Sequence, residues 1–461
     1  MDGPTHLERI GPKGWLRYVF PFQLAEDYDI DEVSRIFKVG FDAAKQRLPA
    51  MGSESVPAPE YKQPGVHKLQ KIPEGEVEQI MVKDLRADPT FPLTFAELKA
   101  KNFPVSAFEA AKICPRSVWP GPGDRLVMSL VQLNFIKGGV IMGWNLFHQF
   151  GDSMTYYTWS QVWAEECRRA QGEKIENPIE LPEKIFTDRE QIRKASGRNA
   201  GRVEDHPEYL VLPFTPTGAP PKILSNTHRG QVFHFTPEAL AALKAEASPR
   251  NASNPSPTDP KYISTNDALS ALLWRTVMAV QNPIESLGDA DPVSAFAIAI
   301  DGRMRTSPPV HPQTQGCFLE YVGVELPIRG ILTGRLADIA IEIRKSVARA
   351  DKEWTDDVVA LVDTLEDVNR ITAKAFTDVP GYHCVQTSWV EFRIYDVNWG
   401  KALGNKVQAV RSPEVGVING CQVTFPAPEQ GGLEVLIGVE EKSLDKLLHE
   451  PLWNKYASII G

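Results

Sequence analysis

The sequence contains few cysteines, and none of them has a partner at a metal-binding or redox spacing. The five cysteines are scattered over a chain of 461 residues, at Cys114, Cys167, Cys317, Cys384 and Cys421. No C-x-x-C motif occurs, and the number is odd, so a disulfide framework is not expected. We expect buried free thiols and a chemistry that needs no metal.

Long apolar runs and a basic leader are also missing. No stretch approaches the roughly 18 consecutive apolar residues that a membrane-spanning helix requires. Residues 1–24 contain no basic segment followed by an uninterrupted apolar core, as a secretory signal would. The sequence therefore predicts a cytoplasmic protein with no membrane span.

Positive charge is in deficit as well. The formal net charge is −9 at pH 7, which argues against a broad nucleic-acid-binding surface. It leaves room for a local basic pocket that holds a phosphorylated cofactor. The chain is longer than the length at which one hydrophobic core usually stops growing, so two domains are expected.

One apolar region of the chain has the pattern of a β-hairpin followed by a helix. Two β-rich runs, 127–136 and 140–147, are separated by a Lys-Gly-Gly sequence that favours a tight turn. From 153 to 169 the apolar residues recur mostly at helical spacing. His148 therefore lies in a predicted turn between a strand and a helix.

Further helices are expected at 266–280 and at 336–353, where apolar stripes recur. The Pro-rich stretch at 177–221 has little periodicity and suits a crossover between two halves. We predict an N-terminal half at 1–200, a linker at 201–225 and a C-terminal half at 226–461.

His148 and Asp152 form an H-x-x-x-D motif in that turn. An imidazole with a pKa near neutrality is suited to act as a general base. The motif alone is weak, but Tyr395-Asp396-Val397-Asn398-Trp399-Gly400 follows later in the chain. Together the two motifs resemble H-x-x-x-D and D-F-G-W-G of the BAHD acyl-CoA-dependent acyltransferases, in particular the fungal branch around trichothecene 3-O-acetyltransferase.

Other segments match this family in the same order along the chain. They are the S-T-x-D-A-L helix at 264–275, D-x-R at 301–303, T-S-W at 387–389 and G-G-x-E-V at 431–435. Two positions depart from the pattern. Ser153 follows Asp152 where many relatives have Gly, and Val397-Asn398 replaces the usual Phe-Gly. No G-x-S-x-G motif of a serine hydrolase surrounds Ser153, so we reject that class.

The resemblance implies an α/β fold of two similar chloramphenicol-acetyltransferase-like domains with a solvent tunnel between them. His148 would be the general base in the tunnel. Asp152 could polarise His148 as in a triad, but the resemblance favours a structural pair with Arg303. No acyl-enzyme is needed, because acyl-CoA is already an activated thioester.

The resemblance also assigns roles around the second motif. Trp389 and Thr387 would donate hydrogen bonds to the oxyanion, and Ser388 would contact the cofactor. Asp396, Trp399 and Gly400 would be structural. Lys401, Lys406 and Arg411 form a basic cluster that could bind the phosphates of CoA, or could be a solvated charged face.

We therefore predict an acyl-CoA-dependent O-acyltransferase of fungal secondary metabolism, acting as a monomer. The acyl donor would be acetyl-CoA, and the acceptor a hydroxyl of a small terpenoid, polyketide or alkaloid. Two alternatives stay open: acyl transfer to an amine, and a catalytically inactive paralogue that only binds a ligand. The altered Val397-Asn398 pair mildly favours the latter.

Overall fold

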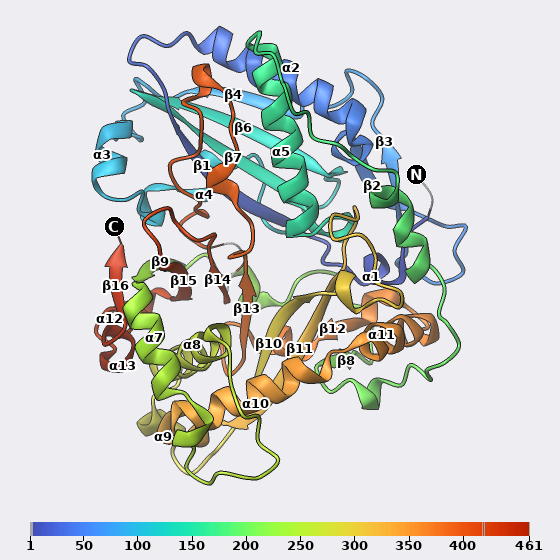
Figure 1. Cartoon of the computed structure of the whole chain (residues 1–461), viewed down its shortest axis with the longest axis vertical. Helices are drawn as coiled ribbons and strands as arrows, with labels where there is room; N and C mark the ends of the chain where they lie inside the picture. The colour runs from blue at the N-terminus through green and yellow to red at the C-terminus, as the bar shows by residue number, and fades with distance from the viewer. Residues whose placement is uncertain (1–2, 417, 419, 461) are drawn as a thin grey trace.

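The structure is a computed structural model that describes residues 3–416, 418 and 420–460. It is built around two sheets, one of four strands and one of seven, with two small accessory sheets (Figure 1). The helices and strands of the first part of the chain are α1 (His6–Arg9), β1 (Trp15–Gln23), α2 (Ile30–Arg47), β2 (Ser53–Pro57), β3 (His67–Lys71), β4 (Ile80–Asp84), α3 (Phe95–Ala100), α4 (Ala110–Ile113), β5 (Leu126–Val127), β6 (Ser129–Ile136), β7 (Gly139–Phe147), α5 (Ser153–Ala170) and α6 (Lys184–Thr187).

The four-stranded sheet has the order β1-β7-β6-β4, and the H-x-x-x-D motif follows directly after β7. Its centre is the expected hairpin, in which β6 and β7 pair antiparallel from Ser129–Leu146 to Ile136–Gly139. Gly138 has φ +79, a backbone conformation that glycine adopts at little cost, at the turn. Both strands are buried along their whole length. The helices α2 and α5 pack side by side on one face of the sheet (Figure 1), and residues between 91 and 114 pack on the other.

The second part of the chain forms the larger sheet, in the order β11-β10-β13-β14-β15-β9-β16. Its elements are β8 (Tyr209–Val211), β9 (His228–Phe235), α7 (Pro237–Glu246), α8 (Thr265–Gln281), β10 (Val293–Asp301), β11 (Leu319–Pro327), α9 (Ile328–Thr333), α10 (Leu336–Arg349), α11 (Lys352–Thr364), β12 (Ile371–Ala373), β13 (Cys384–Ser388), β14 (Cys421–Thr424), β15 (Leu433–Glu440), α12 (Glu441–Leu448), α13 (Pro451–Asn454) and β16 (Ala457–Ile460).

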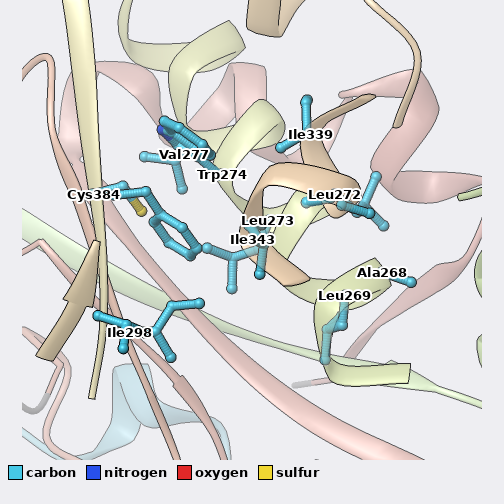
Figure 2. Packing of buried hydrophobic residues seen from close by; sticks show 14 of the residues in the cluster. Ala268, Leu269, Leu272, Leu273, Trp274, Val277, Ile298, Ile339, Ile343 and Cys384 are labelled. Atoms are coloured by element: carbon cyan, nitrogen blue, oxygen red, sulfur yellow. The ribbon is translucent and has the colours of Figure 1, made fainter. Parts of the chain in front are cut away.

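Two long helices cover one face of this sheet. Leu269, Leu273 and Trp274 of α8 pack with Ile339 and Ile343 of α10 in one buried cluster (Figure 2). The same cluster includes sheet residues from β10 and β13. The start of α8 is fixed by a capping box in which Ser264 and Asp267 bond reciprocally.

The helix predicted at 336–353 is in fact two helices. α10 ends at Arg349, and α11 begins at Lys352, so the predicted end was wrong. The break occurs at Asp351, whose carboxylate accepts hydrogen bonds from the backbone N–H groups of Glu353 and Trp354. The sequence pattern predicted a single helix because no Gly or Pro marks the break, and the start of α11 is signalled only by its N-cap, Asp351.

A segment from the second part of the chain crosses to the first sheet. Residues 389–411 leave β13 and lie beside β1 and α5 (Figure 1). The backbone of Arg411 forms an isolated antiparallel β-bridge with Val19 of β1. The linker at 201–225 remains a prediction. The core of the first half also contains residues of the second half, among them Trp389, Trp399 and Val423.

No helix in the described part of the chain combines the length and the apolar character needed to cross a membrane.

Candidate active site

The turn that carries His148 is held by backbone contacts. β7 ends at Phe147, a short 3-10 turn covers His148–Phe150, and α5 begins at Ser153. This places His148 in the strand-to-helix turn expected from the sequence. Gly151 is needed for close packing, because a Cβ atom there would lie 2.7 Å from the ring of Tyr156. The Tyr156 hydroxyl in turn donates to the Phe147 carbonyl.

The tautomer of His148 follows from its hydrogen bond. Its Nδ1 atom lies 2.8 Å from the carbonyl oxygen of Gly151. A carbonyl oxygen can only accept, so Nδ1 carries the proton and the lone pair is on Nε2. Nε2 has no hydrogen-bond partner among the described residues. Burial lowers the pKa of His148 below its ordinary value, so the neutral, proton-accepting form dominates near pH 7.

Asp152 turns away from His148 and pairs with Arg303, as the resemblance implied. Two hydrogen bonds of 2.7 and 2.9 Å join its carboxylate to the guanidinium. The carboxylate also accepts from the N–H groups of Thr155 and Phe318, at 3.1 and 2.9 Å. Burial alone would raise the pKa of Asp152, but Arg303 and these donors outweigh burial and hold the pKa below its usual value.

Arg303 itself is completely buried and belongs to the core. Its guanidinium also bonds to Asp301 at 2.9 Å and to the carbonyl of Thr314, and it lies over the ring of Phe318. The pair therefore joins the start of α5 to the end of β10, and so fixes the His148 turn against the second sheet.

Thr387 and Trp389 lie on the face of the second sheet that meets the first half. Thr387 pairs with Val423 across the strands, and Val423 and Trp389 share the core cluster of the first half. Trp389 is buried and stacks at a tilt on Tyr18, with centroids 4.6 Å apart. Neither its indole N–H nor the Thr387 hydroxyl has a partner among the described residues, so both donors are free for a ligand.

A small pocket lies between Trp389 and the start of α5. Its wall is mostly aromatic and includes Tyr18, Tyr156, Trp389 and Phe392, with Ser153 at the start of α5. The ring of Tyr156 lies 6.4 Å from that of His148. Sequence reasoning did not identify Tyr18 or Ser153 as pocket residues.

The wide tunnel implied by the resemblance remains a prediction. A larger cavity lies elsewhere, between β11 and α10, and shares no residue with this pocket.

Ser388 lies on the opposite face of β13, because side chains alternate along a strand. Its hydroxyl is buried and has no hydrogen-bond partner among the residues that the structure describes, and the same holds for Thr424, which pairs with it across the strands. Gln386, two residues earlier on this face, is fully buried, and neither of its amide atoms has a partner in the described part of the chain. These three residues form a buried polar row. Of these three, the sequence analysis named only Ser388. Gln386 and Thr424 could have been found as polar residues within otherwise apolar strands.

The Asp396–Gly400 segment packs on the first half, away from His148. Trp399 is fully buried, with its ring 5.2 Å from that of Trp163 and 5.3 Å from that of Phe22. Gly400 has φ +87, and a Cβ atom there would collide with the side chain of Gln171. Asp396 is exposed and pairs with Arg393 at the surface.

The basic cluster is not a single surface, and the prediction for Arg411 is wrong. Its side chain is 2% exposed and bonds to Glu434 at 2.6 Å, so it has no free donor face for a phosphate. Lys401 is exposed, and Lys406 is half-buried and pairs with Glu429. A buried guanidinium needs its carboxylate, which the sequence pattern could not reveal.

Comparisons with known proteins identify the family of this chain. A model of trichothecene 3-O-acetyltransferase-like N-terminal domains matches residues 15–167, and a model of the Transferase family matches residues 96–452. The chain belongs to the Transferase family, the BAHD acyltransferases. The enzyme class predicted from the two motifs is thereby confirmed.

Curated relatives of this BAHD chain are fungal. Trichothecene 3-O-acetyltransferase of Fusarium sporotrichioides is 27% identical over 85% of this chain and 82% of its own length. Enoyl-CoA isomerase/hydratase claC of Penicillium crustosum is 24% identical over 98% of this chain, but the chain spans only 50% of that protein.

Solved structures confirm the predicted fold class. The F. graminearum TRI101 structure with coenzyme A and deoxynivalenol superposes with a TM-score of 0.82, covering 100% of this chain and 99% of that one at 22% identity. Vinorine synthase superposes at 0.63, covering 99% and 94% at 16% identity.

Proposed function

We propose that this BAHD acyltransferase moves an acyl group, in the first place acetyl, from acyl-CoA to a hydroxyl of a small natural product. The observation that carries the proposal is the free Nε2 lone pair of His148, fixed by the Nδ1 hydrogen bond to Gly151. Nε2 removes the hydroxyl proton while the oxygen attacks the thioester carbonyl. The intermediate collapses, expels the thiolate of CoA, and the imidazolium returns the proton to it.

The negative oxygen of that intermediate needs donors. The indole N–H of Trp389 and the hydroxyl of Thr387 are unpaired and share the face that meets the first half. Donors fixed in a buried site stabilise the intermediate more than water does. Asp152 and Arg303 act through the turn that holds His148.

Ser388, directly after Thr387 at the end of β13, is the proposed contact for the arm of CoA. Its hydroxyl is buried and has no hydrogen-bond partner among the described residues. Such a group is costly unless it finds a partner, and the pantetheine arm carries two amides that can bond to it. The exposed Lys401 and the half-buried Lys406 are the candidates for the phosphates.

The acceptor is proposed from the pocket wall and the relatives. The pocket is lined mostly by aromatic rings, which suits an apolar carbon skeleton. Relatives are named as acetyltransferases of trichothecenes and of eremophilanes, which are terpenoids. We propose a terpenoid alcohol acceptor, with the enzyme acting as a monomer in the cytosol.

The test is thiol release from acetyl-CoA with a panel of alcohols: deoxynivalenol, geraniol and cinnamyl alcohol, with benzylamine as an amine probe. We expect turnover with an alcohol, and a loss of roughly 10²- to 10⁴-fold in His148→Ala, the usual range for removing a general base. His449→Ala, which removes an exposed imidazole, is the matched control. Equal turnover by His148→Ala and the native protein would contradict the proposal, and release with benzylamine alone would indicate an N-acyltransferase.

A further inference from the structure

The segment of residues 5–14 lies directly against the His148 turn. The carbonyl oxygen of Gly14 accepts the backbone N–H of His148 at 2.8 Å. This hydrogen bond fixes the backbone of His148. The His148 ring is oriented separately, by the Nδ1 contact to Gly151.

Gly11 packs tightly against the backbone of this turn. A Cβ atom at residue 11 would lie 2.7 Å from the carbonyl oxygen and 3.1 Å from the Cα atom of Gln149. Those are backbone atoms of the catalytic turn, so they cannot move aside as a flexible side chain could. Gly11 is therefore required by space, and any added atom must displace the turn or the segment.

The segment is anchored at its other end by buried polar contacts. His6, on α1, is 1% exposed, and its Nε2 atom lies 2.5 Å from Asp363 of α11. Its Nδ1 atom lies 3.0 Å from the Ile192 carbonyl. Glu8, also buried, pairs with Arg189. These contacts hold α1 in place, so the segment does not easily move away from the turn.

We propose that residues 5–14 are a positioning segment for the general base, with Gly11 as the residue that sets the place of the His148 turn. The inference rests on the proposed role of His148. A misplacement of about 1 Å by a change outside the reacting groups can cost on the order of 10²-fold in rate. Close packing of Gly11 on Gln149, backed by the His6 anchor, keeps Nε2 in line with the acceptor hydroxyl.

Gly11→Ala tests this, with Gly40→Ala as the matched control. A Cβ atom at residue 40 would lie 2.7 Å from the Sγ atom and 2.8 Å from the backbone N of Cys167, in the packing of α2 on α5. Both variants therefore meet an equally tight contact, but only Gly11 touches the catalytic turn. We expect kcat for acetyl-CoA and the best alcohol of the panel to fall by at least about 10-fold in Gly11→Ala, with KM for acetyl-CoA unchanged. Gly40→Ala should lower the thermal midpoint but keep kcat per folded enzyme within about two-fold.

A readout without substrate keeps this inference separate from the proposed function. The NMR resonance of the His148 ring, identified by its absence in His148→Ala, should shift in Gly11→Ala and stay in place in Gly40→Ala. His6→Ala, which removes the anchor without adding volume, should shift the same resonance and lower kcat, and it decides the question if Gly11→Ala does not fold. An unshifted resonance in a folded Gly11→Ala or His6→Ala protein would overturn the inference. Loss of all turnover in the native protein would instead overturn the proposed function.

Discussion

At the scale of single residues, the protonation of His148 governs the expected pH dependence. Burial lowers its pKa below the ordinary value of about 6.5, so the imidazole is neutral above that lowered pKa. A general base works only when neutral. We expect kcat/KM to rise with pH through a pKa below about 6.5 and to be flat from there to neutrality. The measurement is kcat/KM for acetyl-CoA from pH 4.5 to 8, and a profile that falls across that range would contradict base catalysis.

Asp152 is expected to matter through structure. Asp152→Asn leaves the buried guanidinium of Arg303 without its principal counter-charge, and breaking a buried pair typically costs about 3–5 kcal/mol. The thermal midpoint should therefore fall together with activity. Arg303→Met should show the same joint loss, because it removes the other partner. If Asp152→Asn keeps its full midpoint while activity disappears, a direct effect on His148 would be the better explanation.

Trp389 tests the oxyanion assignment. Trp389→Phe keeps most of the apolar volume and deletes one N–H donor that has no partner among the described residues. We expect kcat to fall by up to about 10²- to 10³-fold with little change in stability. Single-turnover acyl transfer and the thermal midpoint are the measurements. Full kcat in this variant would make Trp389 a core residue only.

At the scale of elements, residues 396–400 behave as a packed loop. Trp399→Phe should open a void among Trp163, Phe22 and Phe37, and lower the free energy of unfolding by roughly 1–3 kcal/mol. The folded fraction should turn over almost normally, because this ring does not line the pocket beside Trp389. Denaturant unfolding and kcat per folded enzyme measure the two effects. A large fall in kcat at unchanged stability would place Trp399 in the reaction.

The same element explains why a changed motif can still work. Val397 is buried in the core of the first half, and Asn398 caps the turn through a 2.9 Å hydrogen bond from the N–H of Gly400. The positive φ needed here falls on Gly400, which the chain retains. Replacing the usual Phe-Gly by Val-Asn therefore leaves the turn intact.

At the scale of the whole molecule, Arg411 links the two halves. Its guanidinium bonds to Glu434 of the second sheet and to the carbonyls of Asn102 and Phe103 in the first half. We expect Arg411→Ala to lower the free energy of unfolding by about 3–5 kcal/mol, because it leaves Glu434 buried and unpaired. Lys406→Ala, at the surface, should change stability by less than about 0.5 kcal/mol. A stable Arg411→Ala protein with a raised KM for acetyl-CoA would restore the phosphate-binding role that the structure contradicts.

The sequence by itself determined the local elements and the family. Alternation and turn residues gave the hairpin before His148, and helical spacing gave α5 and α8, because these patterns arise from neighbours along the chain. The motifs predicted the enzyme class and the pairing of Asp152 with Arg303. The tertiary structure decided the pairing of polar groups that no motif carries. Arg411 is bound to Glu434, Gln386 and Thr424 have no partner among the described residues, and Gly11 touches Gln149. Such contacts join residues far apart in sequence, and no local period encodes them.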